Sequence, residues 1–263
     1  MKKQYNSKNY LGLIKELALT DFKLKYQNSF LGYLWSLISP FSYFVVLYLV
    51  FTKIFKVGAG IPHYPIYLLL GVMIFSFWNE ATAIAMGSIV SKGDLIRKVY
   101  FPRMVLVISS TLTSLITFVL NMSALIVLAL FTGVRFGPTS LIFILLTLEL
   151  YIFIMGVSFY LAALFVKFRD IGHIWGVANQ ILFYATPIVY PLVMVPNRFA
   201  KIIVLSPLTQ IIQDSRTVLI GVAAPSTRDY WSTGIWPFLL IIFIFISGYF
   251  LFQNMAAKFA EEV

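Results

Sequence analysis

Long apolar runs separated by short polar segments dominate this chain, and six of the runs are long enough to cross a membrane. A spanning helix needs about 20 mostly apolar residues. The runs do not alternate residue by residue, as the strands of a membrane β-barrel do. They are 34–55, 66–88, 104–131, 141–166, 171–195 and 231–252. The pattern predicts an all-α membrane protein with six transmembrane helices.

The segment 10–26 is predicted to form an amphipathic helix that does not span. Glu16, Thr20 and Lys23 fall on its polar face, whereas Asp21 and Lys25 interrupt the apolar one. The residues expected on the apolar face are Leu11, Ile14, Leu17, Ala18 and Phe22. Such a helix lies in the membrane interface. The pattern leaves two roles open, a juxtamembrane anchor or a docking element.

The segment 196–230 is the second one that is too short and too polar to cross alone. Ser206 and Pro207 form a good helix start, since Ser is a favoured N-cap and Pro a favoured first residue. Gly221 and Pro225 close the segment. Short re-entrant helices or a surface helix pair between the fifth and sixth spans fit this pattern.

Composition supports lipid as the main solvent of a single membrane domain, 1–263. The chain is 60% hydrophobic and 11% charged, whereas soluble proteins have about 25% charged residues. We expect an interface helix within 1–30, a helical bundle over 34–252 and a tail over 253–263. The net charge of +10 comes from Lys and Arg beside the apolar runs, which argues against nucleic acid as a partner.

The distribution of basic residues predicts that both termini are cytoplasmic. Six spans place 1–30, 91–103, 167–170 and 255–263 on one side, and these segments hold thirteen of the twenty Lys and Arg residues. Positive loops stay in the cytoplasm. No apolar stretch follows the basic N-terminus within thirty residues, so a cleavable signal peptide is not expected.

Motifs for catalysis or nucleotide binding are missing from the sequence. It has no phosphate-binding P-loop, no zinc-protease motif, no nucleophile elbow and no cysteine. His63 and His173 lie far apart, so we expect no metal site. A membrane-bound glycosyl- or acyltransferase would need clustered catalytic residues, and a secondary transporter would need inverted repeats with paired broken helices. Neither pattern is found, and no enzymatic activity is expected.

Glu80 and Glu149 are the acidic residues that lie well inside predicted spans. A carboxylate in the membrane is costly, so it is a candidate functional group by default. A proton relay would need charged partners on other spans. The other interpretation is that each carboxylate faces a polar cavity or a partner hydroxyl, and both interpretations remain open.

The segment SKGDLIRKVYFPR, 91–103, joins the second and third spans on the predicted cytoplasmic side. Asp94 is expected to cap a short helix over 95–100, which Pro102 ends. Two turns are not stable alone, so the membrane, the bundle or a partner protein must hold them. The segment is either a mechanical lever or an ordinary basic turn.

Five pieces of the chain resemble, in order and spacing, ABC-2 type permeases of polysaccharide export. LIRKVYFPR, at 95–103, is similar to the family's sequence after its second span. The other pieces are SFLGYLWSLISP, KFRDIGHIW, ATPIVYP and LSPLTQIIQDSR, beginning at Ser29, Lys167, Ala185 and Leu205. The last is usually written with Asn-Pro where this chain has Ser206-Pro207.

This resemblance implies a transport subunit in the bacterial inner membrane. It implies a second permease copy, identical or paralogous, and two ATP-binding cassette subunits that hold ATP and Mg²⁺, with no cofactor in this chain. The cargo would be a lipid-linked glycan such as O-antigen, capsular polysaccharide or teichoic acid. An ABC-2 permease for a drug or small lipid is the main alternative.

The resemblance also implies where the ATPase subunits touch this chain. In such permeases the N-terminal helix and the loop after the second span make that contact. The corresponding candidates here are Glu16, Lys23, Asp94, Leu95, Arg97, Lys98, Tyr100 and Arg103. Arg169 and Asp170 are expected to add an ion pair at the cytoplasmic rim.

Aromatic residues near the span ends are candidates for contact with a glycan, because sugars pack their C–H faces on aromatic rings. Tyr and Trp also form the interfacial belt of most membrane proteins, so the two roles remain open. The candidates are Tyr64, Tyr67, Trp78, Tyr184 and Tyr190.

Overall fold

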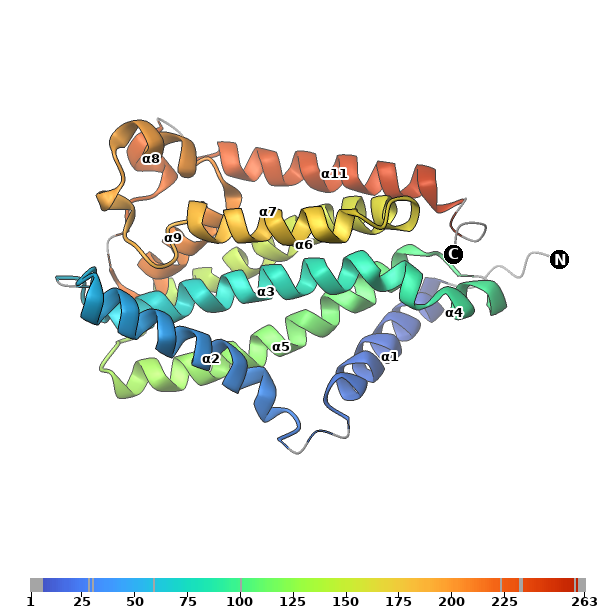
Figure 1. Ribbon diagram of the computed structural model, residues 1–263, viewed down its shortest axis with the longest axis horizontal. Helices are drawn as coiled ribbons and strands as arrows, with labels where there is room; N and C mark the ends of the chain where they lie inside the picture. Colours follow the sequence, from blue (N-terminus) through green and yellow to red (C-terminus); the bar gives the residue numbers. More distant parts are fainter. Residues whose placement is uncertain are drawn as a thin grey trace.

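The computed structural model describes residues 7–257 and 259, except 28, 30, 59, 100, 223, 232 and 233. Tyr100, a candidate coupling residue, lies outside the described residues. The described part of the chain contains helices and loops and no strand, which confirms the all-α prediction (Figure 1).

Among the described residues, five helices are long and apolar enough to span a membrane. Four correspond to expected spans: α3 (Tyr64–Ser91), α5 (Met104–Phe131), α6 (Ile142–Lys167), which a 3₁₀ turn precedes, and α2 (Leu34–Leu49), which continues as a π-helix to Ile54. The fifth, α11 (Trp236–Ala256), begins five residues later than expected. Trp231 is instead extended, and its Nε1 donates to the Lys201 carbonyl at 2.9 Å.

The expected fifth span is a shorter helix, α7 (Ile171–Ala185), which ends ten residues before the predicted end at Val195. Its 15 residues cover about 22 Å at 1.5 Å per residue, less than the bilayer core of about 30 Å. The helix ends because Thr186 precedes Pro187, and a residue before proline is restricted to extended conformations. Thr186 accordingly has a ψ of 135°.

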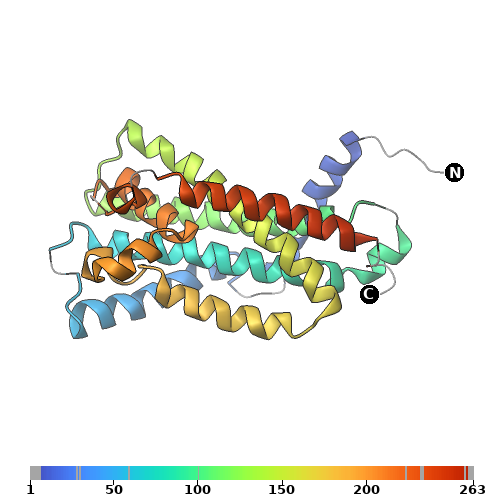
Figure 2. The ribbon, with the colours of Figure 1, turned by 90° about the horizontal axis from the view of Figure 1, so that it is seen from above.

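α3 is the centre of the bundle. In its most apolar 18-residue window 72% of the residues are buried, against 17% for α2 and for α11. α2 and α7 lie along one edge of the bundle, and α11 lies along the opposite edge (Figure 2). α11 packs closely on α6, since a Cβ added to Gly248 would come within 2.5 Å of the Gly156 carbonyl oxygen. Small residues at such a crossing let two membrane helices approach.

One end of the bundle, here named the α4 end, carries α4 (Gly93–Lys98) and α1 (Ser7–Tyr26). α4 ends two residues before the expected position, with Val99 extended at a ψ of 134°, and Phe101 is then buried in the core. Asp94 lies in its first turn, whereas the N-cap is Lys92, so the predicted cap is wrong.

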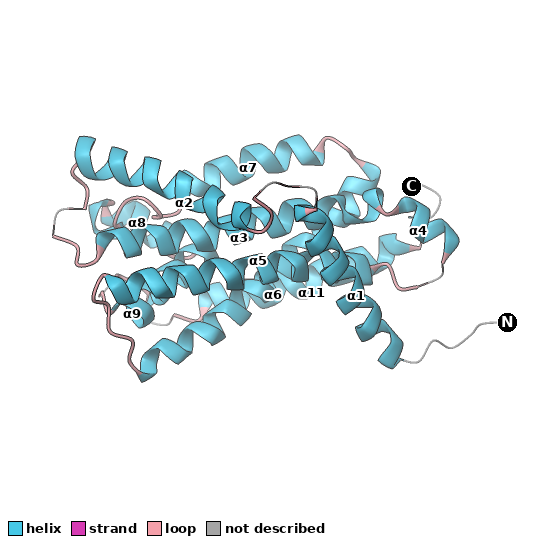
Figure 3. Cartoon of the chain, turned by 90° about the horizontal axis from the view of Figure 1, so that it is seen from below, coloured by secondary structure: helices cyan, strands magenta, loops and turns pink. Residues whose placement is uncertain are grey.

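α1 crosses the bundle at an angle and packs on α5 (Figure 3). Ala18 is 1% exposed, and its carbonyl accepts a hydrogen bond from Thr113 Oγ1 at 3.1 Å. Ile14 and Leu17, from the predicted apolar face, pack on the core, whereas Leu11 of the same face is 72% exposed. The residues of α1 that pack on the core beside Ala18 are Tyr10, Leu13, Ile14 and Leu17.

The opposite end, here named the α9 end, carries the short helices α8 (Asn197–Ile203), α9 (Pro207–Ile220) and α10 (Thr227–Tyr230). α9 begins as predicted, with Ser206 as the N-cap and Pro207 in the first turn, and ends at Gly221. Gly221 adopts a φ of 71°, a left-handed conformation that glycine tolerates. α9 packs against α6 and α3.

Candidate functional site

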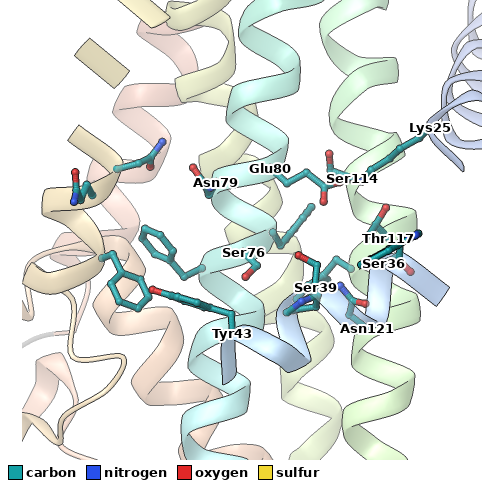
Figure 4. Close-up of a pocket in the computed structure, with 18 of the residues that line it drawn as sticks. Lys25, Ser36, Ser39, Tyr43, Ser76, Asn79, Glu80, Ser114, Thr117 and Asn121 are labelled. Atoms are coloured by element: carbon teal, nitrogen blue, oxygen red, sulfur yellow. Dashed lines mark hydrogen bonds and ion pairs between the residues drawn. The ribbon is translucent and has the colours of Figure 1, made fainter. Parts of the chain in front are cut away.

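A central cavity of about 710 Å³ opens between α2, α3, α5 and α7, with the end of α1 at its edge (Figure 4). Its wall combines hydroxyl, amide and aromatic side chains, although it lies within apolar helices. The polar lining residues are Lys25, Ser36, Ser39, Ser76, Asn79, Glu80, Ser114, Thr117, Asn121, Asn179 and Gln180. A polar wall of this size inside membrane-spanning helices is costly unless it serves a polar ligand or water.

The charged residues of this lining form one ion pair. Lys25 Nζ of α1 lies 2.8 Å from Glu80 Oε1 of α3, and each side chain is about 30% exposed. Burial lowers the pKa of Lys25, but the charge of Glu80 and its hydrogen bond outweigh this and raise the pKa above the usual value. The partner of Glu80 therefore comes from α1 and not from one of the expected spans.

α5 contributes three polar side chains at helical spacing, Ser114, Thr117 and Asn121. Ser114 Oγ and Asn121 Oδ1 are buried and have no hydrogen-bond partner in the structure. Such buried groups are costly when left unpaired. Sequence reasoning missed this row, although its spacing of three and four residues within an apolar helix is a recognisable signal.

Aromatic rings form the other part of the wall. Tyr43 of α2 packs against Phe183 of α7 with ring centroids 5.7 Å apart, and Phe75 of α3 meets the same ring at 5.2 Å. Tyr184, one of the predicted aromatic candidates, also lines the cavity and is exposed. These rings offer flat apolar faces beside the polar groups.

The other aromatic candidates lie outside the lining. Tyr64, Tyr67 and Trp78 are each less than 5% exposed. Trp78 Nε1 donates to Asn179 Oδ1 at 2.9 Å and so positions a lining amide from behind. The Tyr190 hydroxyl donates to the Tyr184 carbonyl at 2.9 Å, at the end of α7.

Arg216 of α9 holds the backbone that follows α7, and no motif predicted this role. It is fully buried, and its guanidinium donates to the carbonyls of Tyr67, Pro187 and Ile188 and to Gln213 Oε1 at 2.7–3.2 Å. The same group lies 3.5 Å from the centre of the Tyr67 ring. Burial lowers the pKa of Arg216 to about 10, so it remains charged at neutral pH.

Glu149 and Asp214 approach one another around Gln210 on the α9 side. Gln210 Nε2 donates to Asp214 Oδ2 at 2.8 Å and also hydrogen-bonds to Glu149. Burial raises the pKa of Asp214. Within the described residues no group of three or more His, Cys, Asp or Glu is arranged to hold a metal ion.

Most of the candidate coupling residues lie at the α4 end, whereas Lys23 is close to Lys25, which pairs with Glu80 at the central cavity. On α4, Asp94, Arg97 and Lys98 are exposed, whereas Leu95 packs on the core beneath. Glu16 and Lys23 are exposed on α1, and Arg103 is the N-cap of α5.

Arg169 and Asp170, which were expected at the cytoplasmic rim, join α6 to α7. Both are exposed, and Arg169 lies over the Phe165 ring at 5.3 Å. The ion pairs observed among the described residues join α1 to Glu80 and Lys92 and do not include these two.

Sequence comparison identifies the family. The ABC-2 type transporter family matches residues 12–220. An O-antigen export system permease protein RfbA of Klebsiella pneumoniae is 27% identical over 265 residues, 99% of this chain and 98% of that protein. An RfbA of Myxococcus xanthus is 26% identical over 97% of this chain and 96% of that protein, and polysialic acid transport protein KpsM of Escherichia coli is 20% identical over 79% and 81%. Because the family match covers well over half of its length, the chain belongs to the ABC-2 type transporter family.

Proposed function

We propose that this chain is the permease subunit of an ABC exporter that moves a lipid-linked polysaccharide or teichoic acid outward across the cytoplasmic membrane. The central cavity carries the proposal, since it places hydroxyl, amide and aromatic groups within membrane-spanning helices. Sugars present C–H faces that pack on rings such as Tyr43 and Tyr184. Their hydroxyls match exposed hydroxyl and amide groups of the wall, such as those of Ser39 and Asn79.

A second permease copy would complete the path. In a lone subunit the polar wall between α2 and α7 would open toward lipid, and the apolar membrane interior does not solvate polar groups. Two copies facing one another across α2 and α7 would enclose their cavities in a common conduit. The proposed partner is an identical subunit or a close paralogue.

The proposed topology has six passages, with α7 and the chain after it as the fifth. The α4 end is then cytoplasmic, because Lys92, Arg97, Lys98, Lys167 and Arg169 gather there. The short helices at the α9 end would be re-entrant on the outer side. Tyr64, Tyr67, Trp78 and Tyr190 would then shape the path from behind its wall, and Tyr184 would touch the cargo.

ATP hydrolysis would take place in two separate subunits, which bind ATP and Mg²⁺ and dock at the α4 end. Arg97 and Lys98 are exposed on a helix of only six residues, which is joined to α3 and leads into α5. Asp94, Leu95, Tyr100 and Arg103, with Glu16 and Lys23 of α1, complete the proposed docking surface. This chain itself is a transport subunit and not an enzyme.

The test is co-expression with an ATP-binding cassette subunit, followed by assays of binding, ATPase rate and export of lipid-linked glycan. We expect Arg97→Glu with Lys98→Glu to dissociate the complex or to uncouple hydrolysis from export. The matched control is Arg198→Glu with Lys201→Glu, which reverses two exposed bases on α8 at the other end. If no ATP-binding subunit associates with the native chain, the proposal is wrong.

A drug or small lipid is the second candidate cargo, because a cavity of about 710 Å³ lies within the usual range of small-molecule sites, about 300–1,000 Å³. The same complex distinguishes the two cargos. Glycan export that is lost in Asn121→Leu, with unchanged efflux of lipophilic dyes, supports the glycan. Dye efflux that is lost in Asn121→Leu, with unchanged glycan export, supports the small molecule.

A further inference from the structure

Two ion pairs join α1 to Glu80 within α3 and to Lys92, the residue that directly follows α3. Lys25 pairs with Glu80, and Asp21 pairs with Lys92. Asp21 and Lys25 are four residues apart and therefore lie on neighbouring turns of the same face of α1. Their partners are twelve residues apart, which is about 18 Å along a helix. One turn of α1 therefore connects a point within α3 with a distant point just after its end.

The two partners belong to different parts of the proposed mechanism. Lys92 is the N-cap of α4, so any displacement of α4 also moves the residue that holds Asp21. Glu80 lines the central cavity. α1 therefore links the exposed helix at the α4 end with the cavity, in addition to the covalent path along α3.

α1 is attached to α5 at a point between its two ends. Ala18 is buried against α5, and its carbonyl accepts the Thr113 hydroxyl hydrogen bond. Lys25 reaches from α1 toward Glu80 past Ser114 and Thr117 (Figure 4). Ala18 is held tightly against α5, whereas Lys25, nearer the C-terminus of α1, makes its contact through a long side chain. The C-terminal turns of α1 can therefore tilt while the helix stays attached at Ala18.

The two ion pairs are partly exposed and lie beside a cavity, so they can break and re-form when α1 moves. Their four side chains are 19–30% exposed. Partly exposed pairs contribute little stability and exchange with water at low cost, whereas buried pairs are strongly destabilised when one partner is lost. A second cavity of about 230 Å³ adjoins them, and Asp21, Lys25 and Lys92 line it together with Ser88 and Ser91.

We infer that Asp21 and Lys25 are positioning residues that transmit the movement of α4 to Glu80 and so change the cavity when ATP is bound or hydrolysed. This inference rests on the proposed coupling to ATP-binding subunits. It adds a specific path, from Lys92 through one turn of α1 to Glu80. The candidate docking residues lie outside this path, so the two ideas are tested by different substitutions.

The experiment uses the full complex and a cysteine introduced at Asn79, an exposed residue of the cavity wall. The chain has no native cysteine, so within this chain a charged maleimide reacts at this position alone, and labelling is read from the band of this subunit after the subunits are separated. Labelling rates are measured with ATP and with ADP, for the native sequence and for Lys92→Asp and Lys25→Glu. The charge swaps Asp21→Lys with Lys92→Asp and Lys25→Glu with Glu80→Lys are measured in parallel.

In the native sequence we expect ATP to change the labelling rate about fivefold or more. Each single reversal abolishes this difference while the complex still assembles, and each swap restores it. Lys15→Glu is the control, since it reverses an exposed charge on α1 outside the two ion pairs.

The inference is overturned if the single reversals leave the ATP-dependent difference unchanged. It is also overturned if the swaps assemble normally but do not restore it. Glycan export is measured separately. The complex that carries Asn79→Cys as its only substitution could show an ATP-dependent labelling rate and yet export no glycan. This result would contradict the proposed cargo, but the test of the path from Lys92 to Glu80 would still hold.

Discussion

The two ends of the bundle hold their basic residues in opposite ways. At the α9 end, Arg216 is fully buried and is satisfied by backbone carbonyls of Tyr67, Pro187 and Ile188. At the α4 end, Lys25 and Lys92 are partly exposed and pair with single carboxylates. A buried cation with fixed acceptors cannot move without a large cost, whereas an exposed ion pair can break and re-form.

This difference indicates that the α9 end is the more rigid of the two. Arg216, Tyr64 and Tyr190 all donate to the backbone between Tyr184 and Val189, so three side chains hold the end of α7. No comparable network of backbone acceptors is observed around Lys25 and Lys92 in the described part of the chain. We therefore expect movement at the α4 end around a fixed α9 end.

The largest effect is expected from Arg216→Met, which preserves much of the side-chain volume. It leaves three buried carbonyls without their donor, and each unsatisfied group costs roughly 1–3 kcal/mol. We expect a loss of at least about 3 kcal/mol in the free energy of unfolding, a large part of the stability of a typical domain. Thermal unfolding of the protein in detergent measures it, with the exposed Arg198→Met as control.

Gly71→Ala tests the same network from α3 and should have an intermediate effect. A Cβ added there would lie 2.8 Å from Arg216 Nη2 and 3.3 Å from Ile188 Cγ2. The guanidinium is held by its acceptors and cannot move aside, so we expect a cost of roughly 1–3 kcal/mol.

Gly87→Ala, on the same helix, is the matched control for this substitution. A Cβ at Gly87 meets nothing within 4 Å. Both changes gain the helix preference of alanine, about 1 kcal/mol, so their difference in thermal unfolding isolates the clash. Equal unfolding temperatures for the two variants would contradict a fixed Arg216.

The smallest effect on stability is expected from Lys92→Ala at the α4 end. Breaking a partly exposed ion pair costs less than about 1 kcal/mol, so the unfolding temperature should remain close to the native one. A loss as large as that of Arg216→Met would show that the two ends do not differ in the way described.

The sequence predicted most of the helices because long apolar runs and proline or glycine boundaries act locally. Four spans and the start of α9 follow from such signals. The end of α7 at Ala185 was harder to predict, because the segment 186–195 is apolar. Pro187 explains the extended conformation of Thr186, and Arg216 holds the carbonyls of Pro187 and Ile188 from a distant part of the sequence.

The candidate site was predicted less well, because it depends on which faces of the different helices pack against one another. Asp21 and Lys25 interrupted the expected apolar face of α1, and the structure places them in ion pairs with α3. Tyr67 lies near a span end, where aromatic residues commonly face the membrane interface. In the structure its ring instead packs on Arg216, which is distant in sequence. Pairings between distant segments leave no periodic signal in one sequence.

The most direct test of the account measures distances at both ends in the same complex. Two spin-label pairs are introduced into the cysteine-free chain, one joining Lys15 of α1 to Ile84 of α3 and one joining Phe199 of α8 to Thr217 of α9, all of them exposed positions. Pulsed electron paramagnetic resonance with ATP and with ADP then compares the two pairs. The account predicts that the distance at the α4 end changes with nucleotide and that the distance at the α9 end does not. A shift at the α9 end with an unchanged α4 end would contradict it.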